Sequence, residues 1–446
     1  MNRPRAIIHP TPSLRGDILA PSSKNYTTRY LLVAALAEGT STVRFPAKSD
    51  DADALLRCLE ALGAKLTWED RDTLRVEGFG RHPRNPGRLD PGNAGAVARM
   101  LMGVGALLDR VEFFTRHAES LGRRPHGDLL EALEQLGARC RSAEGGRLPI
   151  VIEGGRLHGG KVRVSGARSS QFLSSLLFLA PLVGEPVEIE VVEGLKSKPL
   201  VQTTLEVMRT AGIEVEARDD LTHFHVPSPQ GYRAGDYTVN GDWPGAAAIL
   251  AAAAVTHSDV AVGRLYEDQQ GERAIVDVLA RMGATISRPA TATVAVRSTG
   301  NLTGIEFDGD RATDAVLAMA AAACLARGRS RFFNVGNLRL KECDRITEPL
   351  AELRKLGVEC REEPDAFEIV GSPKGYEGGI ELEAHNDHRV IMLLTIVGLR
   401  CRKPVTILDA HHIAKSYPAF FDDLRTLGAR IELLGFDGPP AASPIL

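Results

Sequence analysis

The pattern of hydrophobic and polar positions repeats six times along this chain. The end of an amphipathic helix recurs as LLRCLEALGAKL, LLEALEQLGARC, LEVMRTAGIEV, IVDVLARMGATI, LAELRKLGVEC and FFDDLRTLGARI. In each copy, apolar residues at helical spacing precede a glycine, and a β-prone run follows it. The glycines are Gly63, Gly137, Gly212, Gly283, Gly357 and Gly428, at intervals of 71 to 75 residues. A glycine at this place predicts a left-handed residue that ends the helix.

A second, more hydrophobic helix lies between successive copies, and a turn and a strand follow it. The six segments contain LLVAALA, MLMGVGALL, FLSSLLFLA, AAAILAAAAV, AVLAMAAAACLA and VIMLLTIVGL. Because these helices are apolar on every side, they are predicted to be buried on every side. Each is too short to span a bilayer.

Six such units account for almost all of the 446 residues, which is too long for one ordinary core. The units could form a ring or two clusters of three. Three units packed around three buried helices would supply the surround that the helices need. We therefore expect an α/β (α+β) fold with two three-unit lobes: residues 1–21 plus 241–446, and residues 22–240. Turn-forming residues gather near both joints, at 16–21 and 239–244.

Composition narrows the functional classes. Apolar residues make up 43% and charged residues 25% of the chain, and the formal net charge is −3. These values are typical of a soluble protein, without an overall basic field for nucleic acid or an anionic membrane. The N-terminus lacks a secretory pattern, and the six cysteines form no CxxC pair, which favours a reducing cytoplasm and no zinc site.

Charged and polar residues cluster where the buried helices begin, and a helix start attracts anions. Asp242 and Asp387 are equally well explained as helix caps. Basic residues are different, because a cation near a helix N-terminus is disfavoured by roughly 0.3–1 kcal/mol. Either internal salt bridges or a bound anion could offset this cost, and the anion is the simpler explanation. The basic residues are Lys24, Arg29, Arg99 and Arg389. The pattern thus predicts a two-lobed protein that closes on a ligand with several negative charges.

The ordered motifs resemble one family. PSSKNYTTRYLLVAALAEG, GNAGAVAR, RRPHGDLLEAL, SSQFL, SKP, KECDRI, DHR and AKSYP are similar in order and spacing to those of the 5-enolpyruvylshikimate-3-phosphate synthase family, over residues 15 to 430. The resemblance implies a two-lobed fold of six βαβαββ repeats, three per lobe around buried helices, with the active site in the interlobe cleft. It implies transfer of the enolpyruvyl group of phosphoenolpyruvate to the 5-hydroxyl of shikimate 3-phosphate, in aromatic amino acid (chorismate) biosynthesis. It further implies a cytoplasmic monomer that needs no metal or redox cofactor.

The resemblance also implies roles for individual residues. Asp314 would accept the hydroxyl proton, while Glu342 and Lys24 would handle protonation at C3 and on the leaving group. Phosphoenolpyruvate would be bound by Lys24, Asn93, Gly95, Arg99, Arg124, Gln171, Arg345, Arg389 and Lys415. Shikimate 3-phosphate would be bound by Asn25, Arg29, Ser169, Ser170, Gln171, Ser197, Asp314, Asn337 and Lys341.

Two departures from the family pattern keep alternatives open. Asn25 stands where the family usually has Ser, and Leu200 stands where an aromatic residue is common. The Lys24-Asn25 pair matches UDP-N-acetylglucosamine enolpyruvyl transferases, but their reactive Cys is missing from FFTRHAESLGRRP. A paralogue acting on another cyclic alcohol, or a non-catalytic ligand-binding paralogue, would be a further possibility. The joint presence of Lys24, Asp314, Glu342 and Lys415 argues against the non-catalytic one.

Overall fold

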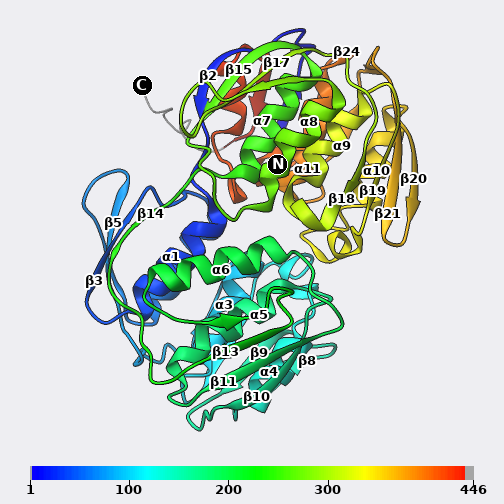
Figure 1. Cartoon of the computed structure of the whole chain (residues 1–446). Helices are drawn as coiled ribbons and strands as arrows, with labels where there is room; N and C mark the ends of the chain where they lie inside the picture. Colours follow the sequence, from blue (N-terminus) through cyan, green and yellow to red (C-terminus); the bar gives the residue numbers. More distant parts are fainter. Residues whose placement is uncertain (1–2, 437–446) are drawn as a thin grey trace. The chain divides into compact units, whose positions relative to one another are not determined.

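The computed structural model of the chain describes residues 3–436. It divides into two compact units, each described here by itself. Unit 1 combines the chain up to Pro21 with the part from Gly241 onward, and unit 2 is Ser22–Asn240. Figure 1 follows the chain through both units by colour.

Three buried helices form the core of each unit, as the apolar segments predict. Every residue of the seventh helix of the chain is buried, because its sequence WPGAAAILAAAAV offers no polar side to solvent. In Figure 1 these helices carry the labels α1, α3 and α5 in unit 2, and α7, α9 and α11 in unit 1. Their bounds are Lys24–Leu36, Gly95–Gly105, Ser170–Leu179, Trp243–Val255, Val316–Cys324 and His388–Gly398.

An amphipathic helix accompanies each buried one. These helices are α2 (Asp50–Ala61), α4 (Gly127–Gln135), α6 (Lys198–Thr210), α8 (Ile275–Met282), α10 (Thr347–Lys355) and α12 (Phe420–Thr426). In α8 the buried side chains are Ile275, Val278, Leu279 and Met282, at the spacing of one helix face. All six predicted glycines follow these helices with a φ between +80° and +114°, which confirms that they end them.

Each unit contains three four-stranded sheets. In one of them, β10 (Gly160–Ser165) pairs parallel with β11 (Val187–Val192), and β13 (His223–Val226) and β12 (Glu216–Ala217) continue the sheet antiparallel. With α5 and α6 between the strands, this is the expected βαβαββ order, and the predicted fold is confirmed. The other strands of unit 2 are β3 (Thr40–Arg44), β4 (Lys65–Trp68), β5 (Thr73–Glu77), β6 (Arg88–Leu89), β7 (Val111–Phe113), β8 (Arg139–Ala143), β9 (Arg147–Glu153) and β14 (Asp236–Thr238).

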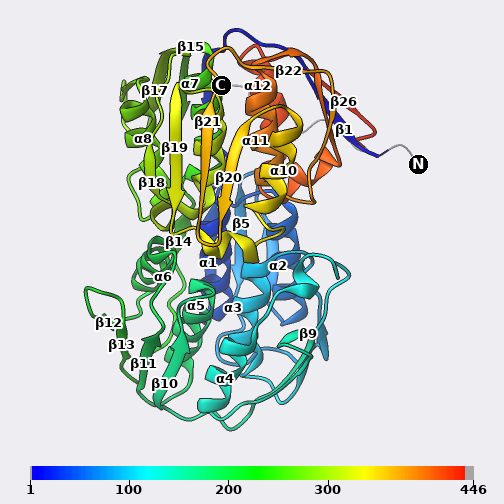
Figure 2. The ribbon, with the colours of Figure 1, turned by 90° about the vertical axis from the view of Figure 1, so that its right-hand side faces the viewer.

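Unit 1 repeats this arrangement, and Figure 2 shows β19, β21 and β20 of one of its sheets side by side. A short two-stranded sheet, β22 with β24, is added to its three larger sheets. The strands are β1 (Arg5–Ile8), β2 (Arg15–Leu19), β15 (His257–Gly263), β16 (Thr285–Ser287), β17 (Val294–Thr299), β18 (Glu306–Asp308), β19 (Gly328–Phe333), β20 (Glu359–Glu363), β21 (Ala366–Gly371), β22 (Tyr376–Gly378), β23 (Glu381–Glu383), β24 (Cys401–Lys403), β25 (Val405–Leu408) and β26 (Ile431–Leu434).

Some repeats are not contiguous in sequence. Strand β14, the last of unit 2, pairs parallel with β3 and completes the first sheet of that unit. Strands β1 and β2 at the N-terminal end join β25, β26 and β15 of unit 1. Each unit is therefore closed by strands from opposite ends of its sequence, which the helix repeat alone did not reveal.

Short 3₁₀ helices lie before or after the longer helices and carry several polar residues. They are η1 (Leu121–Arg123), η2 (Ala180–Leu182), η3 (Gly271–Ala274), η4 (Gly309–Ala315), η5 (Gly336–Leu340) and η6 (Ala410–Lys415). Across residues 3–436, the structure contains no helix long and apolar enough to cross a membrane.

Candidate functional site

Some of the buried helices leave their N-termini open to anions. None of the six, within the described residues, carries an acidic residue in its first turn. The starts of α7 and α11 are capped by the carboxylates of Asp242 and Asp387, and Asp387 Oδ1 accepts the Arg389 N–H at 2.8 Å. Ser169 Oγ caps α5 by accepting the Gln171 N–H at 3.2 Å, and α3 has no side-chain cap. The helix starts of α3 and α5 therefore carry no acidic cap, which favours a negatively charged ligand there.

In unit 1, Arg345 is the centre of a buried network of charges. Its Nε donates to Asp387 Oδ2 at 2.7 Å and its Nη2 to Glu342 Oε2 at 2.8 Å. Its Nη1 donates to Asp314 Oδ1 at 3.2 Å. Burial disfavours the charged guanidinium, but the three carboxylates outweigh burial and raise the pKa of Arg345 well above its usual value. Arg345 therefore stays charged and fixes the orientation of all three carboxylates.

Two lysines of unit 1 adjoin this network. Lys415, at the end of η6, lies 3.7 Å from Glu342 Oε1, and Lys341 Nζ lies 3.9 Å from Asp314 Oδ1. Asn337 is buried on η5. The structure thus gathers Asp314, Lys341, Glu342, Arg345 and Lys415 into one cluster, although the sequence spreads them over a hundred residues.

Arg389 differs from Arg345 in its surroundings. It is buried near the start of α11, where its Nη1 contacts the sulfur of Met392 at 3.6 Å. Its Nε has no hydrogen-bond partner, and the guanidinium forms no ion pair with any carboxylate among residues 3–436. Because a buried cation without a carboxylate partner is costly, Arg389 stays a predicted anion-binding residue.

In unit 2, Arg99 of α3 joins two residues at the start of α5. Its Nη1 donates to Gln171 Oε1 at 2.9 Å and to Ser169 Oγ at 3.2 Å. The guanidinium also lies 4.9 Å from the ring centre of Phe172. Ser170 is buried beside them as the first residue of α5. Arg99, Ser169 and Gln171, which the resemblance assigns to two substrates, are in direct contact.

Arg124 lies close to the start of α3. A Cβ atom added at Gly95 would come within 2.5 Å of Arg124 Nη1, so only glycine lets the guanidinium approach this helix. Asn93 lies in the turn just before the helix, while Ser197 precedes α6 in a left-handed conformation with φ +54°. These positions agree with an anion site at the α3 terminus.

Arg29 is buried in unit 2 and forms hydrogen bonds to neutral groups there. Each of its three side-chain nitrogens donates one hydrogen bond: Nε to Thr204 Oγ1 at 2.9 Å, and Nη1 and Nη2 to the carbonyl oxygens of Asn25 and Leu200 at 3.0 Å each. Burial lowers the pKa of Arg29 to about 10, so the group is still charged at neutral pH. All its acceptors are neutral, and its positive charge is therefore not cancelled by an ion pair.

Lys24 is the first residue of α1 and forms an ion pair with Asp51 of α2 at 3.0 Å. The internal salt bridge considered from the sequence is therefore present for this lysine. Asp51 was missed by the sequence analysis, because in DDADALL it is indistinguishable from an ordinary acidic residue of a first helical turn.

Two other buried groups carried no sequence signal. His126 is fully buried, and burial together with the charges of Arg99 and Arg124 holds its pKa well below the usual value. Glu272 of η3 is also buried and accepts the N–H of Asp314 at 3.2 Å. Glu272 lies outside every motif quoted above, and His126 stands within RRPHGDLLEAL without a role having been assigned to it, so only the structure places both beside predicted residues.

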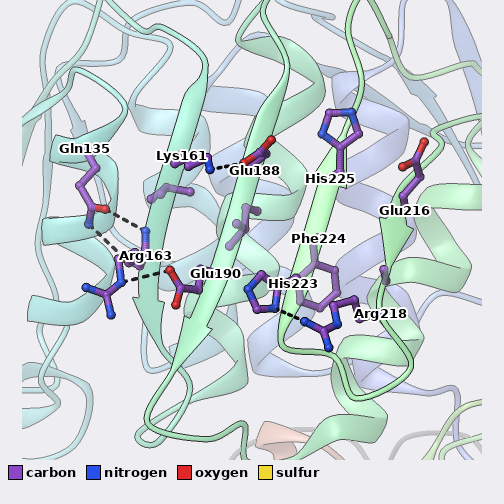
Figure 3. Close-up of a pocket in the computed structure, with 13 residues that line it drawn as sticks. Gln135, Lys161, Arg163, Glu188, Glu190, Glu216, Arg218, His223, Phe224 and His225 are labelled. Atoms are coloured by element: carbon purple, nitrogen blue, oxygen red, sulfur yellow. Dashed lines mark hydrogen bonds and ion pairs between the residues drawn. The ribbon is translucent and has the colours of Figure 1, made fainter.

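A hollow of about 550 Å³ lies elsewhere, on the sheet β10-β11-β13-β12 (Figure 3). Its charged side chains pair across neighbouring strands, with Lys161 at 3.4 Å from Glu188 and Arg163 at 3.3 Å from Glu190. None of the predicted site residues lines it. Because its charges already compensate one another, this hollow is no competing anion site.

Known proteins resemble this chain over almost its whole length. Residues 8–424 match the family described as EPSP synthase (3-phosphoshikimate 1-carboxyvinyltransferase). A 3-phosphoshikimate 1-carboxyvinyltransferase of Deinococcus radiodurans is 49% identical over 427 residues, which cover 96% of each chain. The Burkholderia pseudomallei protein of the same name is 37% identical over 434 residues, covering 97% of this chain and 96% of that one.

Solved structures agree in fold. The EPSP synthase of Acinetobacter baumannii superposes with a TM-score of 0.80 at 25% identity, covering 97% of this chain and 100% of that one. The enolpyruvyl transferase NikO of Streptomyces tendae gives a TM-score of 0.79 at 18% identity, covering 97% and 99%, and shares the fold. With the sequence match over almost the whole length, this chain belongs to the EPSP synthase (3-phosphoshikimate 1-carboxyvinyltransferase) family.

Proposed function

We propose that this protein transfers the enolpyruvyl group of phosphoenolpyruvate to the 5-hydroxyl of shikimate 3-phosphate and releases phosphate. The observation that carries the proposal is the network around Arg345, where Asp314 and Glu342 are held at 3.2 and 2.8 Å. It combines two carboxylates for proton transfer with cations for anionic substrates. Family membership and 49% identity to a protein of that name support it.

The reaction needs an acid–base sequence that these residues can supply. The 5-hydroxyl attacks C2 of phosphoenolpyruvate while C3 gains a proton, and the tetrahedral intermediate then loses phosphate and a C3 proton. Asp314 accepts the hydroxyl proton. Glu342 and Lys24 serve protonation at C3 and on the leaving phosphate. Proton transfer and charge stabilisation suffice for this chemistry, and it needs no metal or redox cofactor.

Each substrate has its own set of binding residues in our proposal. Phosphoenolpyruvate carries a phosphate and a carboxylate, which match Arg guanidinium groups and helix N-termini. The residues that bind phosphoenolpyruvate are Lys24, Asn93, Gly95, Arg99, Arg124, Gln171, Arg345, Arg389 and Lys415. The residues that bind shikimate 3-phosphate are Asn25, Arg29, Ser169, Ser170, Gln171, Ser197, Asp314, Asn337 and Lys341. We further propose that the protein acts as a cytoplasmic monomer in chorismate biosynthesis, without nucleic acid or membrane partners.

Phosphate release is the direct assay of this function. Purified protein with phosphoenolpyruvate should release phosphate when shikimate 3-phosphate is added, and mass spectrometry should find the enolpyruvyl adduct of that acceptor. UDP-N-acetylglucosamine, tested in parallel, should give no release above background. Release with the UDP-sugar alone would refute the proposal, and binding of both substrates without turnover would favour a non-catalytic role.

A further inference from the structure

Glu272 is a buried carboxyl group that the reaction scheme above does not use. It lies on η3, and its side chain is almost entirely removed from solvent, with 3% of the residue exposed. Its Oε1 accepts the backbone N–H of Asp314 at 3.2 Å. Its Oε2 is buried and has no hydrogen-bond partner among the described residues. Oε1 therefore holds the backbone of Asp314 in place, while Oε2 makes no hydrogen bond to any described residue.

The segment that carries Glu272 is tied down by further buried hydrogen bonds. Gln270 Oε1 accepts the N–H of Trp243 at 3.1 Å, and Gln270 Nε2 donates to the carbonyl oxygen of Gly241 at 2.9 Å. The same amide donates to Asp268 Oδ2 at 2.8 Å. Because these bonds join η3 to the start of α7, Glu272 cannot readily turn out to solvent.

The charges that face Glu272 come from two neighbouring elements. Burial, and after it the carboxylate of Asp314 on η4, raise the pKa of Glu272 to about 7, although the cation of Arg389 on α11 acts in the opposite direction. Helix α7 has no titratable side chain, and its cap Asp242 accepts the Gly245 N–H. On α8, Asp277 and Arg281 are exposed and pair with each other. Burial, together with the nearby charges of Asp314 and Arg389, thus determines the charge state of Glu272.

We propose that Glu272 is a positioning residue for enolpyruvyl transfer: as a neutral acid it fixes the backbone of Asp314 and leaves the cation of Arg389 to the anionic substrate. The inference rests on the proposed function. An ionised Glu272 would repel the Asp314 carboxylate and attract the Arg389 guanidinium, in competition with phosphoenolpyruvate. The affinity for phosphoenolpyruvate should therefore fall as Glu272 loses its proton.

The pH dependence of kinetics separates this role from a merely structural one. For the wild-type protein, KM for phosphoenolpyruvate should rise roughly fivefold between pH 6.5 and 8.5. Glu272→Gln keeps an oxygen for the Asp314 N–H but cannot ionise, so its KM should lack this rise while kcat at pH 6.5 stays near wild type. Glu272→Ala loses the acceptor as well, and its kcat should fall at every pH.

Two further variants complete the test. Glu267→Gln changes an exposed carboxylate in the preceding loop and should keep the wild-type profile. If the amide at 272 is not tolerated in the fold, Glu272→Met is equally free of charge and should also lack the rise. If KM for phosphoenolpyruvate varies with pH in the same way in the wild type and in the uncharged variants, Glu272 does not have the proposed role. This result would leave the proposed function standing. A wild type that transfers nothing to shikimate 3-phosphate at pH 6.5 would overturn the proposed function together with the role of Glu272.

Discussion

Two buried arginines of unit 1 illustrate what decides the role of a charged residue. Arg345 is surrounded by Asp314, Glu342 and Asp387, so protein carboxylates already balance it. Arg389 has a sulfur contact and a buried Nε without a partner among residues 3–436. The first guanidinium therefore orients the three carboxylates, and we propose that the second binds an anion. Their sequence motifs, KECDRI and DHR, give no hint of this division.

Replacing the proposed base should separate catalysis from binding. In Asp314→Asn the shape is kept, but the side chain can no longer accept the hydroxyl proton, so kcat should fall roughly 10²–10⁴-fold. Binding of phosphoenolpyruvate, followed by calorimetry, should change only modestly. Asp277→Asn, an exposed carboxylate of α8, serves as the control and should leave both quantities unchanged. An Asp314→Asn protein with normal kcat and lost affinity would exclude the base role.

Sequence reasoning at the level of single residues pointed to the cations but not to some of the acidic residues beside them. Lysine and arginine beside apolar helix starts are conspicuous, because their charge is costly there. Asp51 and Glu272 are acidic residues in ordinary polar surroundings along the chain, and only folding brings them to Lys24 and Asp314. Long-range partners of this kind leave no periodic signal.

At the scale of elements, close helix packing positions the anion-binding residues. Helices α3 and α5 meet at Gly103, whose N–H donates to Ser175 Oγ at 3.1 Å. The same hydroxyl donates to the carbonyl oxygen of Arg99 at 2.7 Å. This crossing therefore sets the distance between Arg99 and its partners Ser169 and Gln171. The apolar patterns predicted both helices, but not the residue at which they touch.

A methyl group at this crossing should loosen it. In Gly103→Ala the new Cβ would lie 2.8 Å from the carbonyl oxygen of Ser175, which only a backbone shift can relieve. Overpacking of this kind costs about 1–3 kcal/mol. The thermal unfolding midpoint, measured by circular dichroism, should drop by roughly 2 °C or more. Gly127→Ala, at the open start of α4, has nothing within 4 Å and should melt like the wild type. Equal midpoints for both variants would show that the crossing tolerates the extra volume.

At the scale of the whole molecule, the sixfold helix pattern predicted the fold because each copy encodes the same local elements. Glycines such as Gly283 end the outer helices through a left-handed conformation that is favourable for glycine alone. The pairing of strands that are distant in sequence was not predictable in the same way. The pairing of β14 with β3 joins residues almost 200 positions apart, and β-prone runs do not specify their partners.

Our central proposal is that Arg124 and Arg389 both contribute to the binding of phosphoenolpyruvate. It is tested most directly by calorimetric titration of phosphoenolpyruvate, in the presence of shikimate 3-phosphate, into Arg124→Gln of unit 2 and Arg389→Gln of unit 1. Each variant should bind phosphoenolpyruvate roughly 30-fold or more weakly than the wild type, since a charge-assisted contact is lost. Wild-type affinity in either folded variant would contradict the claim.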